Sequence, residues 1–363
     1  MAKIFNINLK SSAIATPARR VAQPSAEFYS IFSQEELLDI IHTLEFRREI
    51  PLKYSYKGTG AQNWDKFYLK YIRPRWYRNS NPEILLLRDN FALINSHLAK
   101  SRQLTIIDVG VGNSYSIKEF IHRLNQMGKV KRYIALDISK ELLELSQRNF
   151  INWFPDIRFS SCTIDIENCS LSKILLKNQD NLEADDTAKI IFHLGVTMGN
   201  HHNRIGVLKN LRNSLGKNDL LVFTNEIGSN SQWDGRARGG FKYHVDKVYA
   251  WLKKHIGIDS EDCQLLRKYD NLTDSIVANI KLCHDYAINF SLSAIEQQIE
   301  IYTGEEITIW RQHKYEIPEL RQEIEQAGLE LVHYSTDRYF ANIMVICKVA
   351  SCNSPDTYSI ADS

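Results

Sequence analysis

The 363-residue sequence lacks the features that would indicate a membrane span, a nucleic-acid surface or a structural metal. No apolar run approaches the ~20 residues of a membrane-spanning helix, so a soluble protein is expected. The 45 lysines and arginines are nearly balanced by 43 acidic residues, and a net charge of +2 gives no electrostatic reason to expect a nucleic-acid partner. The six cysteines form no CxxC pair and show no regular spacing, which argues against a zinc site or a disulfide framework and indicates a reducing cytoplasm. A small-molecule partner is therefore expected, and nothing in the sequence indicates an oligomeric state.

The length exceeds the range over which one hydrophobic core keeps growing, so two domains or one large elaborated domain are expected. Residues 1–26 contain no acidic residue and are rich in Ser, Ala and Pro, a composition typical of a flexible arm and also of an organellar transit peptide. We expect an arm, followed by a helix that the capping box Ser33-x-x-Glu36 predicts. Residues 351–363 are expected to form a flexible polar tail.

The stretch TIIDVGVGNS, residues 105–114, joins an apolar run to a glycine turn. Gly110 and Gly112 allow a tight turn and a close approach of the backbone to a ligand. Ser116-x-x-Glu119 then predicts the start of a helix by a second capping box. A lone GxG is a weak signal, because many glycines only serve turns. The order of strand, glycine turn and helix is nevertheless how a parallel strand presents a nucleotide-like ligand.

Two further apolar runs end in acidic residues. Residues 133–136 lead into Asp137, where doubly wound folds place a carboxylate that binds ribose hydroxyls, although a solvated strand end is the alternative. Residues 157–166 form a plausible third strand that ends near Asp165, a position close to the adenine in such folds. The sequence thus predicts a parallel sheet with a cofactor site at the carboxyl ends of its strands.

A fourth apolar strand, residues 189–194, runs into the turn GVTMGN, which closes at Asn200. A strand that stops in a glycine-rich turn at this edge of a parallel sheet is a typical ligand site. The adjacent His201 and His202 point in different directions on a helix or on a strand, so they make a poor metal site. No metal is expected.

The remaining segments surround these strands. The aromatic residues between 54 and 78 suggest a pocket wall or lid, with ordinary core packing as the alternative. After Gly228 the composition changes, and a second domain is expected to resume there. The expected elements are helices over residues 84–99, 139–149 and 319–327, a largely helical stretch over 243–272, extended segments over 295–303 and 307–310, and a closing pair of strands over 329–334 and 342–347.

With these elements in order, the pattern of Asp108, Gly110, Gly112 and Ser114 resembles motif I of class I S-adenosylmethionine (SAM) methyltransferases, with Ser114 where many of them have a third glycine. The chain from about residue 51 through 348 resembles the histidine-specific methyltransferase family. The segments that carry the resemblance are KYSYKGTG, RPRWY, DVGVGN, ALDIS, HLGVTMGN and GEEITIWRQHKY. HLGVTMGN is the most specific, because the family's turn has the form Leu-Gly-x-Thr-x-Gly-Asn.

The resemblance implies an α/β fold of the class I SAM methyltransferase type, Rossmann-like, with a mostly parallel seven-stranded sheet over residues 83–228 and 313–350. A second, discontinuous α+β domain for substrate recognition would comprise residues 27–82 and 229–312. SAM would be the cofactor, bound by Asp108, Gly110, Gly112 and Asp137, with Asp165 and Ile166 near its adenine and Gly195 near its sulfonium end. The amino and carboxylate groups of an amino acid would be held by Tyr56, Tyr77 and Asn200.

Methyl transfer from a sulfonium to an amine depends on positioning, because the nitrogen must reach the methyl carbon in line within a water-poor pocket. Neither a metal nor a covalent nucleophile is needed. One segment departs from the family: the glutamate and serine that contact imidazole there fall on Trp310 and Gln312 here. We expect these two residues to line a side-chain pocket suited to an aromatic, longer or modified side chain better than to histidine. The alternative is an alignment slip that leaves Trp310 as a core ring.

The leading hypothesis is a SAM-dependent N-methyltransferase that acts on the amino group of an amino acid or related small amine. One alternative is an enzyme of the same fold that methylates another atom of a natural product or peptide. The other is a SAM-binding partner subunit without turnover. The last is disfavoured, because a non-catalytic subunit has no need of the amine-orienting Tyr56, Tyr77 and Asn200.

Overall fold

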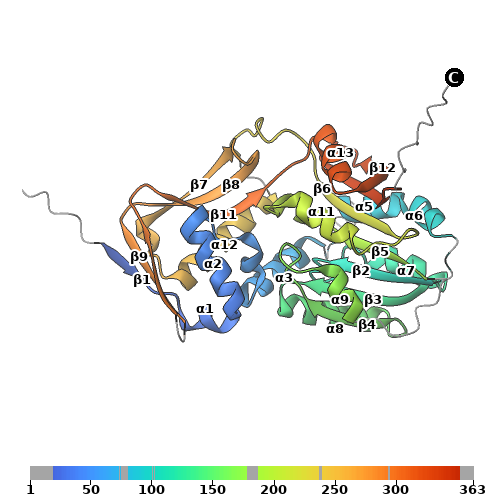
Figure 1. Cartoon of the computed structure of the whole chain (residues 1–363), viewed down its shortest axis with the longest axis horizontal. Helices are drawn as coiled ribbons and strands as arrows, with labels where there is room; N and C mark the ends of the chain where they lie inside the picture. Colours follow the sequence, from blue (N-terminus) through green and yellow to red (C-terminus); the bar gives the residue numbers. More distant parts are fainter. Residues whose placement is uncertain are drawn as a thin grey trace, which may run out of the picture.

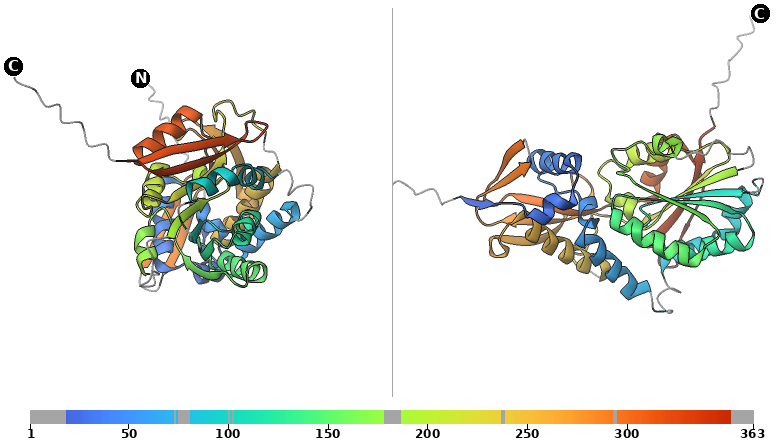
Figure 2. Two further views of the ribbon diagram at one scale, coloured as in Figure 1. Left: turned by 90° about the vertical axis from the view of Figure 1, so that its right-hand side faces the viewer. Right: turned by 90° about the horizontal axis from the view of Figure 1, so that it is seen from below.

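The computed structural model describes residues 19–351 except residues 73, 75–80, 100, 102, 178–186, 237–238 and 293–294. The described chain forms two lobes, which the right-hand view of Figure 2 shows side by side. One lobe is built around a seven-stranded sheet and the other around two three-stranded sheets. Both lobes take segments from distant parts of the sequence, because the chain leaves each lobe and later returns to it.

The seven-stranded sheet has the strand order β12-β13-β6-β5-β2-β3-β4. Its strands are β2 (Gln103–Val109), β3 (Val130–Asp137), β4 (Arg158–Thr163), β5 (Thr187–His193), β6 (Leu220–Glu226), β12 (Leu329–Thr336) and β13 (Asn342–Val349). The first five pair in parallel, whereas β13 runs antiparallel to β6 and β12. The expected mostly parallel, seven-stranded sheet is confirmed. The central strands are near-continuous apolar runs because both faces of a parallel sheet are covered.

Helices pack on both faces of this sheet (Figure 1). One face is covered by α5 (Pro82–Asp89), α6 (Phe91–His97), α7 (Lys118–Gln126) and α8 (Lys140–Trp153). The other face is covered by α9 (Leu171–Lys177), α11 (Arg204–Arg212) and α13 (Ile317–Gln326). The carboxyl ends of the parallel strands stay open toward the second lobe, which places a ligand site between the lobes.

The second lobe has one hydrophobic core of its own, shared by its sheets and helices. Its first sheet has the order β1-β9-β10 and its second the order β11-β8-β7. The strands are β1 (Arg20–Ala22), β7 (Cys263–Asp270), β8 (Ser275–Leu282), β9 (Tyr286–Leu292), β10 (Ile295–Ile301) and β11 (Glu306–Gln312). The helices are α1 (Ala26–Ile31), α2 (Gln34–Arg47), α3 (Thr59–Ile72) and α12 (Gly239–Ile256), with short 3-10 turns η1 (Leu52–Tyr56) and η2 (Ser260–Asp262).

Several local expectations differ from the structure. The flexible arm predicted for residues 1–26 is wrong for its last part, because β1 pairs with β9 and Ser25 caps α1. The helix expected through residue 272 ends at Ile256, and β7 follows it. The helix predicted for residues 84–99 is divided into α5 and α6 at Asn90, whose side-chain amide and backbone amide both donate to the Leu86 carbonyl.

The two predicted capping boxes have different outcomes. The Ser33–Glu36 box is present with both of its hydrogen bonds. The Ser116–Glu119 box is wrong, because α7 begins at Lys118 without a side-chain cap. Glu119 instead accepts two hydrogen bonds from Arg88 of α5, at 2.9 and 2.8 Å, and this bidentate ion pair joins the two helices.

Candidate active site

A cavity of about 390 Å³ lies between the lobes, at the carboxyl ends of β2, β3, β4 and β5. Both lobes contribute to its wall, which includes Gly110, Asp137 and Asn200 on one side and Tyr56 and Trp310 on the other. This volume falls in the range of small-molecule sites, which are concave and carry a few polar groups on a mostly apolar wall.

The glycine turn after β2 requires its small residues. Gly110 and Gly112 have φ of 72° and 54°, in the left-handed region that favours glycine. A Cβ atom on Gly112 would lie 2.4 Å from Cη2 of Trp64, which belongs to α3 of the other lobe. Ser114 also takes the left-handed conformation, with φ of 63°, and its hydroxyl pairs with Ser146 at 2.6 Å. At the third small position of the motif, Ser114 thus adopts the left-handed backbone conformation that glycine usually takes.

Asp137 lies at the end of β3 on the cavity wall and is only 6% exposed. Its carboxylate accepts hydrogen bonds from the backbone amides of Gly112 at 3.1 Å and Ser139 at 2.9 Å. Burial raises its pKa to about 6, although these amides oppose the rise. Asp137 therefore links the glycine turn to the start of α8 and lines the cavity. It is not the solvated strand end that was the alternative.

Asp108 lies deeper than its predicted cofactor-binding role requires. It is 2% exposed, is not among the described residues that line the cavity, and accepts the Tyr133 hydroxyl proton at 2.6 Å. Burial raises its pKa to about 7, with the charges of Asp137 and Glu83 adding to the rise. Asp108 is connected to the glycine turn through Tyr133, whose hydroxyl also lies 3.4 Å from Oγ of Ser114.

Asp165 and Ile166 line the cavity just after β4, and Asp137 lines it at the end of β3. The Nζ atom of Lys53, from η1 of the other lobe, donates to Asp165 at 2.7 Å and lies 3.6 Å from Glu167. The same amine lies 3.3 Å from Asp39 on α2. Lys53 therefore joins the two lobes at the adenine side of the predicted cofactor site, a contact that the sequence did not indicate.

A pair of histidines, also missed at the level of sequence, connects the loops around the cavity. His193 Nδ1 lies 2.9 Å from the Val109 carbonyl, which can only accept, so this nitrogen carries the proton. Its Nε2 then accepts from Nε2 of His201 at 3.0 Å, while Nδ1 of His201 lies 3.6 Å from Glu167. Burial, with the charge of His201 beside it, lowers the pKa of His193 to about 3. The pair holds together the loops after β2, β4 and β5.

Asn200 ends the short helix α10 (Thr197–Asn200) and lines the cavity. The turn is fixed because Gly199 donates to the Asn225 side chain at 3.0 Å, and a Cβ on Gly199 would lie 2.2 Å from the His313 carbonyl. The Oδ1 atom of Asn200 is buried and has no hydrogen-bond partner among the described residues. An unsatisfied buried acceptor costs about 1–3 kcal/mol, which a ligand N–H group would offset.

The other predicted site residues have different positions. Tyr56 lines the cavity, and burial together with Asp137 raises its pKa, so its hydroxyl stays protonated. Tyr77 lies outside the described residues. Gly195, with φ of 84°, accepts a hydrogen bond from Thr224 at 2.9 Å beside the cavity-lining Thr197.

Trp310 is at once a pocket residue and a core residue, since it lines the cavity and packs in the second lobe at 6% exposure. Gln312 is buried but is not among the described residues that line the cavity, so its predicted place in a side-chain pocket is not supported. Arg311 lines the cavity instead and forms an ion pair with Glu49 at 3.1 Å. A register shift between Thr308 and Trp310 in the pairing of β11 with β8 disturbs the alternation expected of a strand.

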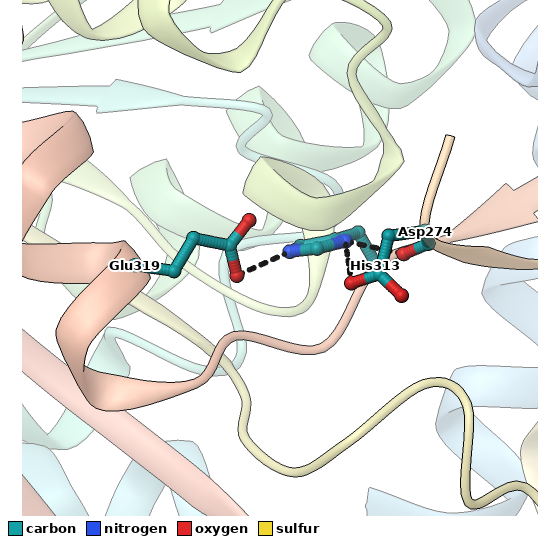
Figure 3. A group of neighbouring side chains, drawn as sticks. All are labelled: Asp274, His313 and Glu319. Carbon is teal, nitrogen blue, oxygen red and sulfur yellow. Dashed lines mark hydrogen bonds and ion pairs between the residues drawn. The ribbon is translucent and has the colours of Figure 1, made fainter. Parts of the chain in front are cut away.

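Asp274, His313 and Glu319 lie together where the chain returns to the seven-stranded lobe, but they do not converge on a metal (Figure 3). Nδ1 of His313 lies 2.7 Å from the Asp274 carbonyl and Nε2 lies 3.0 Å from Glu319, on opposite sides of the ring. Each ring nitrogen of His313 therefore already has protein partners, and Nδ1 also lies 3.3 Å from the side-chain amide nitrogen of Asn230. The His313 backbone amide donates to the Gly199 carbonyl at 2.9 Å, so this cluster supports the turn that carries Asn200.

Among the described residues, no helix combines the length and the apolar composition of a membrane span.

Comparison with known proteins finds a relative whose sequence is similar to part of this chain. The chain is 25% identical over 214 residues to ergothioneine biosynthesis protein 1 of Neurospora crassa, a match that covers 58% of this chain and 22% of that protein. The chain therefore spans about a fifth of the length of this relative.

Among solved structures, a SAM-dependent methyltransferase from Clostridium acetobutylicum is 12% identical, with a TM-score of 0.45 over 79% of this chain and 99% of that one. The CcbJ methyltransferase from Streptomyces caelestis is 12% identical, with a TM-score of 0.40 over 73% of this chain and 90% of that one. A family model described as histidine-specific, SAM-dependent methyltransferase matches residues 35–348. Since this match spans most of the sequence, the chain belongs to the family described as histidine-specific, SAM-dependent methyltransferase.

Proposed function

We propose that the protein transfers the methyl group of SAM to the amino nitrogen of an amino acid or a related small amine. The observation that supports this most is the buried, unpartnered Oδ1 atom of Asn200 on the wall of the cavity. A carboxamide oxygen can only accept hydrogen bonds, and an amine or ammonium group is the ligand that donates them. We therefore assign the amino group of the substrate to Asn200.

The residues around the glycine turn fit a positively charged cofactor. Asp137 and Asp108 are buried carboxyl groups with raised pKa values, and neither has an ion-pair partner in the described part of the chain. Gly110 and Gly112 line the cavity, and their left-handed backbone lets the chain come close to a ligand there. SAM supplies an activated methyl group on a sulfonium and carries an ammonium group, so its positive charge would offset the burial of the cavity-lining Asp137.

The protein's own contribution to the reaction is position and exclusion of water. The protonated hydroxyl of Tyr56 can donate to the substrate, while Asn200 accepts from its amine and so directs the nitrogen lone pair. Tyr77 has the same proposed role through the family resemblance. The rings of Trp64 and Trp310 make part of the cavity wall apolar. We propose that the lobe with two three-stranded sheets is the substrate-recognition domain.

The test is a mass-spectrometric screen of the purified protein with SAM, amino acids and simple amines, run in parallel with Asn200→Ala. We expect one or more methyl groups on an amino nitrogen, a loss of activity of at least about tenfold in the variant, and S-adenosylhomocysteine (SAH) affinity within about twofold of the wild type. Methylation of oxygen, sulfur or carbon would favour the natural-product alternative. SAH binding without turnover on any amine would favour the partner subunit, and SAH affinity that falls as activity does would assign Asn200 to the cofactor.

A further inference from the structure

Glu83 is a carboxyl group beside the turn after β5, close to the cavity-lining Thr197, and the sequence motifs do not include it. It belongs to the first turn of α5, after Asn81, whose side chain caps the helix, and Pro82. Its Oε1 atom would lie 3.7 Å from a Cβ atom on Gly195, and Oγ1 of Thr197 would lie 3.6 Å from the same atom. The Glu83 carboxyl and the Thr197 hydroxyl thus flank Gly195, the glycine of the turn after β5.

The Gly195 turn adjoins the glycine turn after β2. A Cβ atom on Gly110 would lie 3.9 Å from Cγ2 of Thr197, and both Gly110 and Thr197 line the cavity. The Thr197 hydroxyl donates its proton to the Leu194 carbonyl at 3.2 Å, so its oxygen lone pairs remain able to accept. Two acceptors, a carboxylate and a hydroxyl oxygen, therefore stand next to a residue without a side chain.

Among the described residues, the Glu83 carboxyl has neither an ion-pair partner nor a hydrogen-bond donor. Loss of hydration raises its pKa to about 7, and it adds to the raised pKa of Asp108. A first-turn glutamate is favourable for a helix dipole, but that role leaves the carboxyl in water. A cationic ligand would offset the lost hydration of the Glu83 carboxylate, and the missing side chain of Gly195 leaves room for it.

We propose that Glu83 binds an alkylammonium group at the Gly195 turn, with Thr197 as the second acceptor. This inference rests on the proposed function, which brings two such groups to the cavity: the α-ammonium of the cofactor's methionine part and the ammonium form of the substrate amine. An ammonium offers three N–H donors in a compact tetrahedral group, so it can engage a carboxylate and a hydroxyl at once. The absence of a side chain on Gly195 leaves the space that the group would occupy.

The test uses Glu83→Gln, which keeps the shape of the side chain and removes its charge. Its matched control is Glu35→Gln, because Glu35 is also a first-turn acid but is exposed on α2 of the other lobe. Calorimetry would measure two probes: SAH, which carries the ammonium without a sulfonium charge, and 5′-methylthioadenosine, which has neither. Thermal unfolding of each variant checks that the fold is retained.

If Glu83 binds the cofactor's ammonium, Glu83→Gln raises the Kd for SAH about 10- to 100-fold and leaves 5′-methylthioadenosine within about twofold. If it binds the substrate, SAH affinity is unchanged, and KM for the methylated amine rises by a similar factor. Thr197→Val, which removes the second acceptor without touching α5, is expected to weaken the same ligand and keeps the test open if Glu83→Gln does not fold. Wild-type SAH affinity together with wild-type KM in both variants would overturn the inference and leave the proposed function intact. A wild-type protein that binds no SAH would overturn both.

Discussion

At the scale of single residues, the carboxyl groups around the glycine turn differ in what compensates their burial. Asp108 receives the Tyr133 hydroxyl proton, and Asp137 receives two backbone amide protons. Carboxylate oxygens have about four lone-pair sites, so Asp137 on the cavity wall can still accept from a ligand, whereas Asp108 is enclosed by protein. Asp137 is therefore the residue whose loss should be felt by the cofactor, and Asp108 the one whose loss should be felt by the fold.

We predict that Asp137→Ala weakens SAM binding, because each charge-assisted hydrogen bond to a ribose hydroxyl contributes about 1.5–3 kcal/mol. Calorimetry with SAM measures the change, which should be an increase in Kd of at least tenfold. Asp156→Ala, at an exposed position between α8 and β4, is the matched control and should bind as the wild type does. Unchanged affinity in Asp137→Ala would remove the cofactor argument.

Asp108 predicts a pH dependence of stability. Its folded-state pKa of about 7 lies above the ordinary value of 3.8 for an aspartate, so between these two pH values the folded state holds a proton that the unfolded state has lost. The free energy of unfolding should therefore fall as pH rises from 5 to 8, and Asp108→Asn should reduce that fall by about 1–3 kcal/mol. Urea unfolding of the ligand-free protein at both pH values measures the difference, and parallel curves for wild type and variant would contradict it.

At the scale of elements, the sequence predicts those helices and strands whose pattern is visible within a short stretch of the chain. β2, β3 and β5 are near-continuous apolar runs that end in a glycine turn or an acid, so the parallel sheet and its ligand edge could be predicted. β7 could not, because it is a half-exposed strand whose charged residues suggested a helix. Arg267 and Lys268 instead pair with Asp246 and Glu306 from other elements. In β7, packing against other elements decides between helix and strand, and the periodicity of the sequence does not reveal it.

In the candidate site, too, the residues that belong to local motifs could be predicted from the sequence, and the contacts between distant residues could not. Gly110, Gly112 and Asp137 stand in short motifs, so their arrangement could be predicted. The contacts of Lys53 with Asp165 and of Glu83 with the Gly195 turn join residues more than 100 positions apart, and no local pattern indicates them. The histidine pair joins residues that are close in sequence, but which way each ring points depends on the α10 turn.

The segment between β11 and α13 gives a prediction about the Asn200 turn. His313 is fully buried, and its ring lies between the Asp274 carbonyl and Glu319. We expect His313→Ala to lower the free energy of unfolding by about 2–4 kcal/mol, because it leaves a void and two unpaired acceptors. Urea unfolding measures this loss. His122→Ala, on the exposed side of α7, should change stability by less than about 0.5 kcal/mol, and an equally small effect of His313→Ala would show that the cluster does not support the turn.

At the scale of the whole molecule, the cavity belongs to neither lobe alone. The seven-stranded lobe supplies the glycine turn, Asp137 and Asn200, and the other lobe supplies Tyr56 and Trp310. Lys53 joins the lobes through ion pairs with Asp39, Asp165 and Glu167. Under the proposed function, cofactor chemistry and side-chain selection belong to different lobes, so we expect that the second can change while the first is kept.

Substrate choice is the prediction that follows from this division. The family is described as histidine-specific, yet Trp310 stands where the resemblance places the glutamate that contacts imidazole, and an indole can donate but not accept a hydrogen bond. Sites built to hydrogen-bond a polar group discriminate by ~10⁴ or more when the partner is lost. In a competition of the common amino acids and simple amines for SAM, we therefore expect an aromatic, longer or modified side chain to be methylated faster than histidine. Trp310→Glu should raise the rate on histidine relative to the others, whereas Trp310→Phe, which keeps an apolar ring, should not. If the wild type methylates histidine fastest, Trp310 is a core ring that does not read the side chain, and the cavity selects its substrate through other residues of the same lobe.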